Sequence, residues 1–177
     1  MIPVLETERL ILREGRERDF EVFAAFYADP EASGPVGGPL SRAEAWGRVA
    51  FNRGHWVLRG FGNWAIEEKA TGDYVGWSGL WFPEGFPERE VGWGLVLAKR
   101  GRGYATEAAG RARAYAYEVL GWPTVISLIA PDNPRSIRVA ERLGATFERT
   151  LPFEGRDFGV YRHPSARSLA SSSNAIH

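Results

Sequence analysis

One stretch, Glu90 to Glu107, constrains the fold of this 177-residue chain more than any other. It starts with apolar residues at every second position, as in a β-strand: Val91, Trp93, Leu95 and Leu97. The run Arg-Gly-Arg-Gly at 100–103 then breaks the alternation, and a helical pattern begins at about Tyr104. A strand that leads through a glycine-rich turn into a helix forms an anion site, because the first helical N–H groups lack partners and the helix dipole is positive there.

The two glycines of this turn are the residues that let an anion reach the main chain. Gly101 and Gly103 can adopt positive φ without steric cost, and Lys99, Arg100 and Arg102 add positive charge nearby. The dinucleotide fingerprint G-x-G-x-x-G and the nucleoside-triphosphate loop G-x-x-x-x-G-K-[ST] are both absent. We expect the main chain of residues 101–105 to hold a diphosphate; a solvated connection without a ligand is the alternative.

Two spaced motifs carry a resemblance to a known family. The run Arg100-Gly101-Arg102-Gly103-Tyr104-Ala105 resembles the [Q/R]-x-x-G-x-[G/A] acyl-coenzyme-A signature of the GNAT N-acetyltransferases. The wider run 90–108 is similar to the branch that includes the ribosomal-protein N-terminal acetyltransferases. A second block, from Asn133 to Gly144, resembles the N-x-x-S … E-K-L-G-F segment of that branch. Element order extends the resemblance over roughly residues 5 to 163.

Hydrophobic periodicity predicts an α/β fold with a mixed sheet. The expected strands are 7–14, 61–69, 74–80, 90–97, 125–130, 147–150 and 158–162, and the expected helices are 18–28, 41–52, 104–120 and 133–143, with a loop at 31–40. The resemblance implies a GNAT-like, mostly antiparallel central sheet with one splayed parallel strand pair and about four flanking helices. We expect an acetyltransferase domain over residues 1–164 and a disordered, Ser-rich tail over residues 165–177.

Composition narrows the classes of function. The chain has no cysteine, hence no disulfide, thiolate metal site or cysteine nucleophile, and its three histidines lack metal or triad spacing. Its 22 basic and 22 acidic side chains balance, which argues against nucleic acid or an anionic membrane as a partner. No apolar run approaches roughly 20 residues, and the start lacks a signal-peptide core. We expect a cytoplasmic monomer or homodimer without a metal.

The resemblance also implies how the cofactor, acetyl-CoA, is held. The strands on either side of the splay leave a gap in which the pantetheine arm bonds the main chain of Trp93, Leu95 and Leu97. The diphosphate then lies at Arg100, Gly101, Arg102, Gly103, Tyr104 and Ala105, while Asn133 holds an amide of coenzyme A. Gly92 and Gly94, next to the gap, suit either a close backbone approach or packing under a neighbouring tryptophan.

Acetyl transfer to an amine requires a base, a donor to the thioester oxygen and a proton for the leaving thiolate. Glu90 is the first candidate base and Glu154, at the tip of the closing hairpin, is the second; the alternatives are a strand-end charge and an ordinary turn acid. The Trp93 N–H is the expected donor to the thioester oxygen. Ser136 is the expected donor to the thiolate, and it also fits the first turn of a helix capped by Asn133.

Three positions depart from the resembled family: Ala140 replaces a tyrosine that serves many relatives as general acid, Leu97 replaces proline, and Ala145 replaces phenylalanine. Trp77, Trp81 and Trp93 are candidates either for the wall of the acceptor pocket or for the core. We expect an N-acetyltransferase that passes the acetyl group directly to a primary amine, on a protein N-terminus or a small molecule. The alternative is a non-catalytic acyl-CoA-binding regulatory module, which the missing tyrosine favours and which Glu90 and Ser136 argue against.

Overall fold

The computed structural model describes residues 1–174, and its centre is an eight-stranded sheet in the order β1-β2-β3-β4-β5-β6-β8-β7. All neighbouring strands pair antiparallel except β5 and β6, which are parallel. This confirms the mixed sheet with one parallel pair. Residues 175–177, which include His177 and the end of the predicted tail, lie outside the described part of the chain. Within residues 1–174 no helix is long and apolar enough to cross a bilayer.

The predicted elements are all present, with shifted bounds. The strands are β1 (Leu5–Glu6), β2 (Leu10–Arg13), β3 (Asn63–Glu68), β4 (Tyr74–Trp81), β5 (Glu90–Leu95), β6 (Ile126–Ile129), β7 (Thr146–Phe153) and β8 (Arg156–Arg162). The α-helices are α1 (Phe20–Ala28), α2 (Pro30–Ser33), α3 (Arg42–Arg59), α4 (Tyr104–Glu118), α5 (Pro134–Arg142) and α6 (Ala166–Asn174). Short 3₁₀ turns cover Glu17–Asp19, Gly34–Val36 and Leu97–Lys99.

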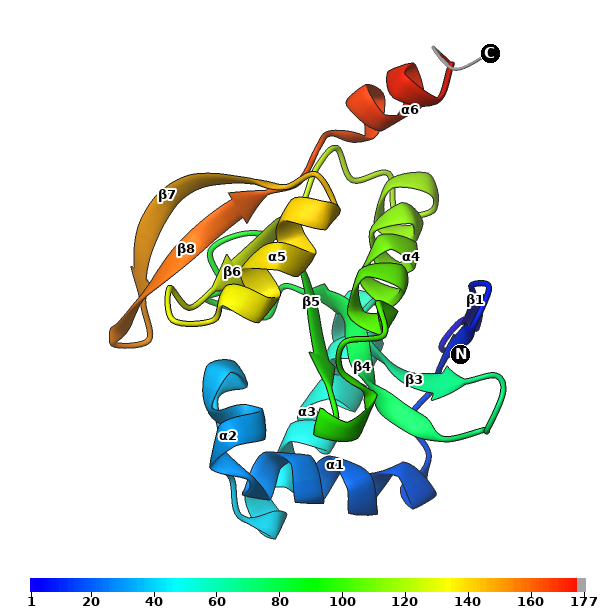
Figure 1. Cartoon of the computed structure of the whole chain (residues 1–177), viewed down its shortest axis with the longest axis vertical. Coiled ribbons are helices and arrows are strands. Elements are labelled where there is room, and N and C mark those ends of the chain that lie inside the picture. Colours follow the sequence, from blue (N-terminus) through cyan, green and yellow to red (C-terminus); the bar gives the residue numbers. More distant parts are fainter. Residues whose placement is uncertain (175–177) are drawn as a thin grey trace.

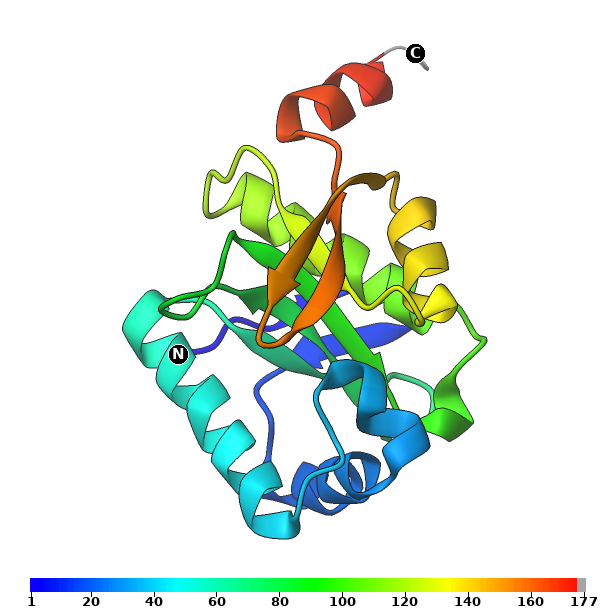
Figure 2. The same cartoon turned by 90° about the vertical axis from the view of Figure 1, so that its left-hand side faces the viewer.

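The residues described contain six α-helices, against the predicted number of about four. One addition is α2, a single turn inside the predicted loop 31–40, which starts because Asp29 accepts hydrogen bonds from the N–H groups of Glu31 and Ala32. The other is α6. Helices α1 to α3 gather at one end of the molecule, and α6 lies at the opposite end (Figures 1 and 2).

Helix α6 lies within residues 165–177, for which the sequence predicted a disordered tail. The start of this helix is tied down, because the Ala166 N–H donates to the Pro123 carbonyl at 3.0 Å. The Ser165 hydroxyl accepts the Ser168 N–H at 3.1 Å, which caps the first turn. Composition missed this helix because its apolar content is low, whereas a capped start and helix-forming Ala, Arg and Leu residues are sufficient for a short helix.

Helix α3 is longer than predicted. It opens with the expected capping box, in which Ser41 and Glu44 exchange hydrogen bonds between side chain and main chain. The sequence predicted that Gly54 would end it, yet the helix continues to Arg59 and closes at Gly60, which has φ 77°. A glycine inside a helix costs only about 1 kcal/mol, and burial of Trp56 two residues later offsets that cost.

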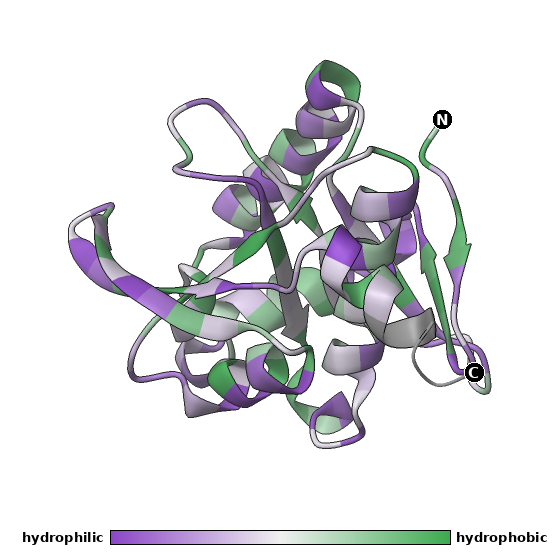
Figure 3. Ribbon diagram, turned by 90° about the horizontal axis from the view of Figure 1, so that it is seen from above, coloured by the Kyte–Doolittle hydropathy of each residue, from purple (hydrophilic) through white to green (hydrophobic). Residues whose placement is uncertain are grey.

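The main core lies between α4 and the sheet. Helix α4 presents a stripe of fully buried small residues to β4 and β5: Ala108, Ala109, Ala112 and Ala116. Small side chains allow the helix to approach the strands closely, where Val91 and Trp93 of β5 complete the packing. Apolar and polar residues alternate in bands along the ribbons, as expected for elements buried on one face only (Figure 3). Helices α1 to α3 form a second, smaller cluster of their own.

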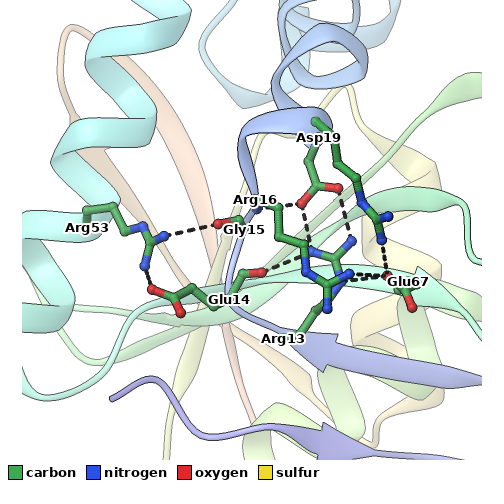
Figure 4. A network of polar contacts seen from close by, with 8 residues as sticks. Arg13, Glu14, Gly15, Arg16, Asp19, Arg53 and Glu67 are labelled. Carbon is green, nitrogen blue, oxygen red and sulfur yellow. Dashed lines mark hydrogen bonds and ion pairs between the residues drawn. The ribbon is translucent and has the colours of Figure 1, made fainter.

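A buried ion network joins this second cluster to the sheet (Figure 4). Arg13, at the end of β2, is 3% exposed and forms a double hydrogen bond to Asp19, at 2.7 and 2.9 Å. Its Nε also donates to Glu67 of β3 at 2.7 Å. Burial alone would raise the pKa of Asp19, but the bonds from Arg13 and from the Arg16 N–H outweigh it and leave the pKa below its ordinary value.

We expect Asp19→Ala to lower the free energy of unfolding by about 3 kcal/mol, because it leaves a buried guanidinium short of one carboxylate. Urea denaturation at pH 7 measures this. The matched control is Glu21→Ala, which removes the exposed partner of Arg42 and should leave the midpoint unchanged. Equal midpoints for the two variants would show that the Arg13 network does not hold α1 in place.

Candidate active site

The two parallel strands separate almost at once. Strands β5 and β6 share one residue pair, Glu90 with Ile126, and the Ile126 N–H donates to the Arg89 carbonyl at 3.0 Å. The next odd-numbered carbonyl of β5, that of Val91, also faces β6, because it accepts a bond from a β6 side chain. By the alternation of a strand, the main-chain groups of Trp93 and Leu95 face the same gap. The Leu95 carbonyl accepts a bond from the Arg100 guanidinium at 3.1 Å.

Leu97 lies beyond this edge. The sequence predicted a strand that includes Leu97, but β5 ends at Leu95 and Leu97 begins a 3₁₀ turn. Its carbonyl accepts the Arg100 N–H at 3.2 Å, and its side chain is 40% exposed. Alternation could not reveal this turn, because a hydrophobic residue at the next odd position continues the pattern. Leu97 therefore belongs to the turn that follows β5, and its main chain is not part of the strand edge.

The glycine-rich turn has the geometry expected of an anion site. Gly101 and Gly103 have φ 78° and 83°, in the left-handed region that favours glycine. The first N–H of α4 with a helical acceptor is that of Glu107, which donates to the Gly103 carbonyl at 3.1 Å. Among residues 1–174, no protein acceptor bonds the main-chain N–H groups of residues 101–105. Five donors at the mouth of one helix are therefore open to a ligand.

The basic side chains of the turn are mostly committed elsewhere. Lys99 pairs with Glu68 at 2.6 Å and with Asp73 at 2.8 Å. Arg100 donates to the carbonyls of Leu95 and Ala32, so it ties the turn to β5 and α2. Arg102 is exposed, and 3.8 Å separates its guanidinium from Glu68. Of the three charges counted in the sequence, only Arg102 is left for a ligand, and the main chain carries most of the attraction.

Glu68 organises the inner side of the turn. It is 6% exposed, and it accepts hydrogen bonds from Lys99, Thr71 and the Tyr104 hydroxyl. These partners, Lys99 first, lower the pKa of Glu68 to about 2, so it stays ionised at any physiological pH. The predicted cofactor residue Tyr104 therefore uses its ring and hydroxyl for structure, and only its N–H faces the ligand side.

Arg9 holds the outer side of the turn. It pairs with Glu107 at 2.6 Å, donates to the Arg102 carbonyl at 2.9 Å and lies 4.8 Å from the centre of the Tyr104 ring. Thr7 adds a bond to Glu107 at 2.6 Å. Sequence reasoning missed both Glu68 and Arg9, because nothing in local spacing marks a partner that lies 31 or 36 residues away, as for Glu68, or 98 residues away, as for Arg9.

A large cavity brings the separate candidates together. Its volume is about 1390 Å³, and it lies between the sheet, helices α1 and α3, and the tip of the β7–β8 hairpin. It is lined by residues from both sequence motifs and from the hairpin, among them Glu90, Asn133, Ser136 and Glu154. The chain thus places both candidate bases and the candidate thiolate donor around one cavity.

Tryptophans form part of the floor of this cavity. Trp77 and Trp81 line it from β4. Trp93 of β5 also borders the cavity, but it packs in the core under α4 as well. A Cβ at Gly94 would lie 2.7 Å from the Trp77 indole, and one at Gly92 would lie 3.6 Å from it. Gly94 is therefore needed because Trp77 packs across it, whereas a Cβ at Gly92 would make only an ordinary contact with the indole.

A bulge in β4 aims two aromatic side chains at the cavity. In the pairing of β3 with β4, Ile66 lies opposite Gly76 and Glu67 lies opposite Tyr74, so Val75 is an extra residue. Tyr74 and Trp77 consequently line the same cavity, although an odd separation would place them on opposite faces of a regular strand.

Glu90 lies at the point where β5 and β6 separate. Its carboxyl oxygen Oε1 accepts the Leu128 N–H at 2.9 Å. Burial raises the pKa of Glu90 to about 8, and the Leu128 N–H opposes this rise. The side chain is half-buried by accessible surface, and the surface that it retains faces the cavity. A carboxyl group with this pKa can accept a proton near neutral pH.

Ser136 and Asn133 form the cap of α5. The Asn133 side-chain oxygen accepts the Ser136 N–H at 3.1 Å, and its amide nitrogen donates to the Ser136 hydroxyl at 3.0 Å. The hydroxyl oxygen is thus an acceptor from Asn133, and its own proton remains free to be donated into the cavity. Ala140, at the position of the missing tyrosine, is fully buried in the core, so no acid can come from there.

Glu154 occupies the tip of the β7–β8 hairpin. It is exposed and has φ 49°, and Gly155 follows with φ 79°, which together make the two-residue turn expected from Glu-Gly. Glu154 also borders the cavity. It differs from Glu90 in its surroundings, since water reaches it directly.

Comparison with known proteins agrees with this geometry. The family model of the acetyltransferase (GNAT) domain matches residues 9–146. A crystal structure of an acetyltransferase from Agrobacterium tumefaciens C58 is 39% identical, with a TM-score of 0.85 over 93% of this chain and 95% of that one. The uncharacterised N-acetyltransferase YoaA of Bacillus subtilis 168 is 26% identical over 85% of this chain and 87% of its own. Spermidine N-acetyltransferase from Vibrio cholerae, solved with CoA and spermine, shares the fold at 16% identity, with a TM-score of 0.73 over 93% and 99% of the two chains.

The chain therefore belongs to the GNAT acetyltransferase family, and the resemblance noted in its motifs is confirmed. The family uses acetyl-CoA as the acetyl donor, and the Vibrio cholerae structure contains CoA on the same fold.

We expect the buried Glu90 to lower the stability of the protein as pH rises. Its folded pKa, about 8, exceeds that of an unfolded glutamate, so between pH 4.5 and 8 the unfolded chain releases a proton that the native protein keeps. The free energy of unfolding should fall through this window by up to about 1.4 kcal/mol per pH unit.

Glu90→Gln removes the titration but keeps an oxygen that can accept the Leu128 N–H. The variant should melt above the wild type at pH 8, and the difference should shrink toward pH 5. Thermal melts of both proteins from pH 5 to 9 measure this, and parallel curves would show that the Glu90 carboxyl is not desolvated.

Proposed function

We propose that this protein is an acetyl-CoA-dependent N-acetyltransferase that passes the acetyl group directly to a primary amine. One observation carries the proposal: five open N–H groups at the mouth of α4 follow the end of β5, and the carboxyl of Glu90 lies at the start of the same strand, where it lines the cavity. The open N–H groups suit the binding of an anion of high charge. The Glu90 carboxyl suits the removal of a proton at the other end of the strand.

The cofactor would lie along the gap from α4 to Glu90. The N–H groups of residues 101–105 would bind the diphosphate, with Arg102 as the available side-chain cation. The pantetheine arm would bond the main chain of Trp93 and Leu95, where the edge of β5 faces the gap. Asn133 would meet an amide of the arm from α5. In this arrangement the thioester lies between Trp93, Ser136 and Glu90.

The chemistry assigned to the side chains follows from their bonds. Glu90, with its raised pKa, takes a proton from the acceptor ammonium or amine, and the free amine attacks the thioester carbonyl. The Trp93 N–H stabilises the oxyanion. Ser136, whose oxygen is already held by Asn133, donates its hydroxyl proton toward the leaving sulfur. The acetyl carbon gains a bond to nitrogen and loses its bond to sulfur. As it does so the nitrogen releases its excess proton, which replaces the one that Ser136 gives to sulfur, and coenzyme A leaves as the thiol.

The acceptor lies in the wider part of the cavity, between β4, α1, α3 and the hairpin tip. Trp77 and Trp81 would form its wall, and Glu154 would lie at its rim. The acceptor is a primary amine of a small molecule or of a protein N-terminus, and both remain within the proposal.

We expect Gly101→Asp to abolish measurable binding of acetyl-CoA, since it places negative charge against the diphosphate at a site where a Cβ meets no protein atom. The matched control is Gly121→Asp, at the other end of α4. Gly121 has a similar φ, 67°, and equal open space, so both variants carry the same backbone strain. Titration calorimetry compares them; wild-type affinity in Gly101→Asp would contradict the loop assignment.

We expect Glu90→Gln to lower kcat about 10²-fold or more with unchanged affinity for acetyl-CoA, as for loss of a general base. Wild-type kcat should rise with pH to a limit near the Glu90 pKa of about 8. Cleavage of the thioester with a panel of amines and N-terminal peptides measures both. Glu154→Gln is the control: if it is the inactive variant, the base is Glu154. Binding of acetyl-CoA without turnover for every amine would favour the regulatory module.

A further inference from the structure

Where β5 and β6 separate, side chains rather than main-chain groups provide the hydrogen-bond partners of the strands. In a parallel ladder that continued beyond the pair Glu90–Ile126, the Leu128 N–H would donate to the Val91 carbonyl. In this protein each of these groups has a side-chain partner instead. The Leu128 N–H donates to Glu90 at 2.9 Å, and the Val91 carbonyl accepts the Ser127 hydroxyl at 2.7 Å. The ladder therefore stops without leaving a buried polar group unpaired.

A short chain of buried polar groups orients Ser127. Ser127 and His163 are each 2% exposed, and 3.0 Å separates the Ser127 hydroxyl from His163 Nε2. His163 Nδ1 lies 3.1 Å from the Arg113 guanidinium of α4, which can only donate. Nδ1 is therefore the acceptor, Nε2 carries the proton and donates to Ser127, and the Ser127 proton is directed to Val91. Burial, with the charge of Arg113, lowers the pKa of His163 to about 3, so this chain stays neutral at physiological pH.

Glu90 and Ser127 act on the two sides of the sheet. Glu90 reaches Leu128 from the cavity, and Ser127 reaches Val91 from the side on which Arg113 of α4 lies. We propose that Ser127, oriented by His163, is a positioning residue that holds the β5–β6 gap open for the acyl-CoA arm and keeps Glu90 bonded to Leu128. This inference rests on the proposed function only where it names acyl-CoA as the ligand in the gap.

Loss of the Ser127 hydroxyl has a specific structural consequence. The Val91 carbonyl would be buried without a donor, and the nearest donor along the strand direction is the Leu128 N–H. If Leu128 turns to Val91, the parallel ladder gains one residue pair and the gap narrows next to Trp93. Glu90 then loses the N–H that opposes the rise of its pKa. A closed gap and a more basic carboxyl should therefore appear together.

Burial raises the pKa of Glu90 and the bond from the Leu128 N–H opposes that rise, without a charged partner of the carboxyl. The titratable or charged groups that line the same cavity come from several elements: Glu17, Asp19, Tyr27, Arg48, Arg53, Tyr74, Glu84, Glu154 and Arg156, with Arg16 beside Glu17. None of them bonds Glu90 in the described part of the chain, and the rise in its pKa has burial as its cause.

The test compares Ser127→Ala with Ser78→Ala. Ser78 of β4 is also a buried serine whose hydroxyl donates to a β5 carbonyl, that of Gly92, at 2.8 Å, but on the closed, antiparallel side of β5. We expect Ser127→Ala to raise the KM for acetyl-CoA about threefold to tenfold and Ser78→Ala to leave it unchanged, as for loss of one hydrogen bond that matters to the gap. Ser127→Thr, which keeps the hydroxyl, should restore the wild-type KM.

The second readout needs no turnover. The ¹³C shift of the Glu90 carboxyl, followed by NMR against pH, should give a higher pKa in Ser127→Ala than in the wild type and no change in Ser78→Ala. A structural role unrelated to the gap would not move this value. An unchanged Glu90 pKa in folded Ser127→Ala, or equal effects of the two alanine variants, overturns the inference.

A measurement on the wild-type protein covers the case in which Ser127→Ala does not fold. The Leu128 amide proton shift should titrate with the same pKa as the Glu90 carboxyl, because the two are bonded. Independent titration overturns the inference without any variant. If instead the wild type neither binds acetyl-CoA nor cleaves it while these titrations coincide, the proposed function fails and the positioning of Glu90 by the β5–β6 separation stands.

Discussion

The parallel pairing of β5 with β6 ends after one residue pair, and the rest of the site depends on that. Two strands that part within a sheet expose main-chain groups that must find other partners, since buried N–H and C=O groups cannot remain unpaired. At the base of the gap Glu90 and Ser127 provide those partners. Further along, the edge of β5 at Trp93 and Leu95 faces an open gap, where an amide-rich ligand can pair with it.

A second constraint holds the far end of the gap. The glycine-rich turn has two residues at positive φ, and such a turn has no stiffness of its own. Glu68 and Arg9 supply it from opposite sides: Glu68 bonds Lys99 and Tyr104, and Arg9 bonds Glu107 and the Arg102 carbonyl. The N–H groups of residues 101–105 are thus fixed in place before a ligand arrives, which avoids an ordering cost on binding. The positive side chains of the turn serve mainly as structure.

Features that depend on neighbouring residues could be predicted from the sequence, whereas features that depend on residues distant in the chain could not. The strand, turn and helix from Glu90 to Glu107 could be predicted, because alternation, two glycines and an Ala-rich helix are local signals. The cap of α5 by Asn133 and the Glu154–Gly155 turn are local in the same sense. The end of α3 could not be predicted, since burial of Trp56 overrides Gly54, and neither could the β4 bulge at Val75, which depends on pairing with β3. Trp93 joins the core although it also borders the cavity, whereas Trp77 and Trp81 line the cavity, because strand register decides which face each side chain takes.

The sequence by itself determined the order of elements, the mixed sheet and the position of the glycine-rich turn, because each rests on the spacing of neighbouring residues. Only the tertiary structure decided how the site is held. Arg9 meets Glu107, Lys99 turns to Glu68, and His163 orients Ser127 across strands and helices far apart in the chain. It also decided that Glu90 is desolvated, since a carboxyl group acquires a raised pKa from the protein packed around it and not from its neighbours in sequence.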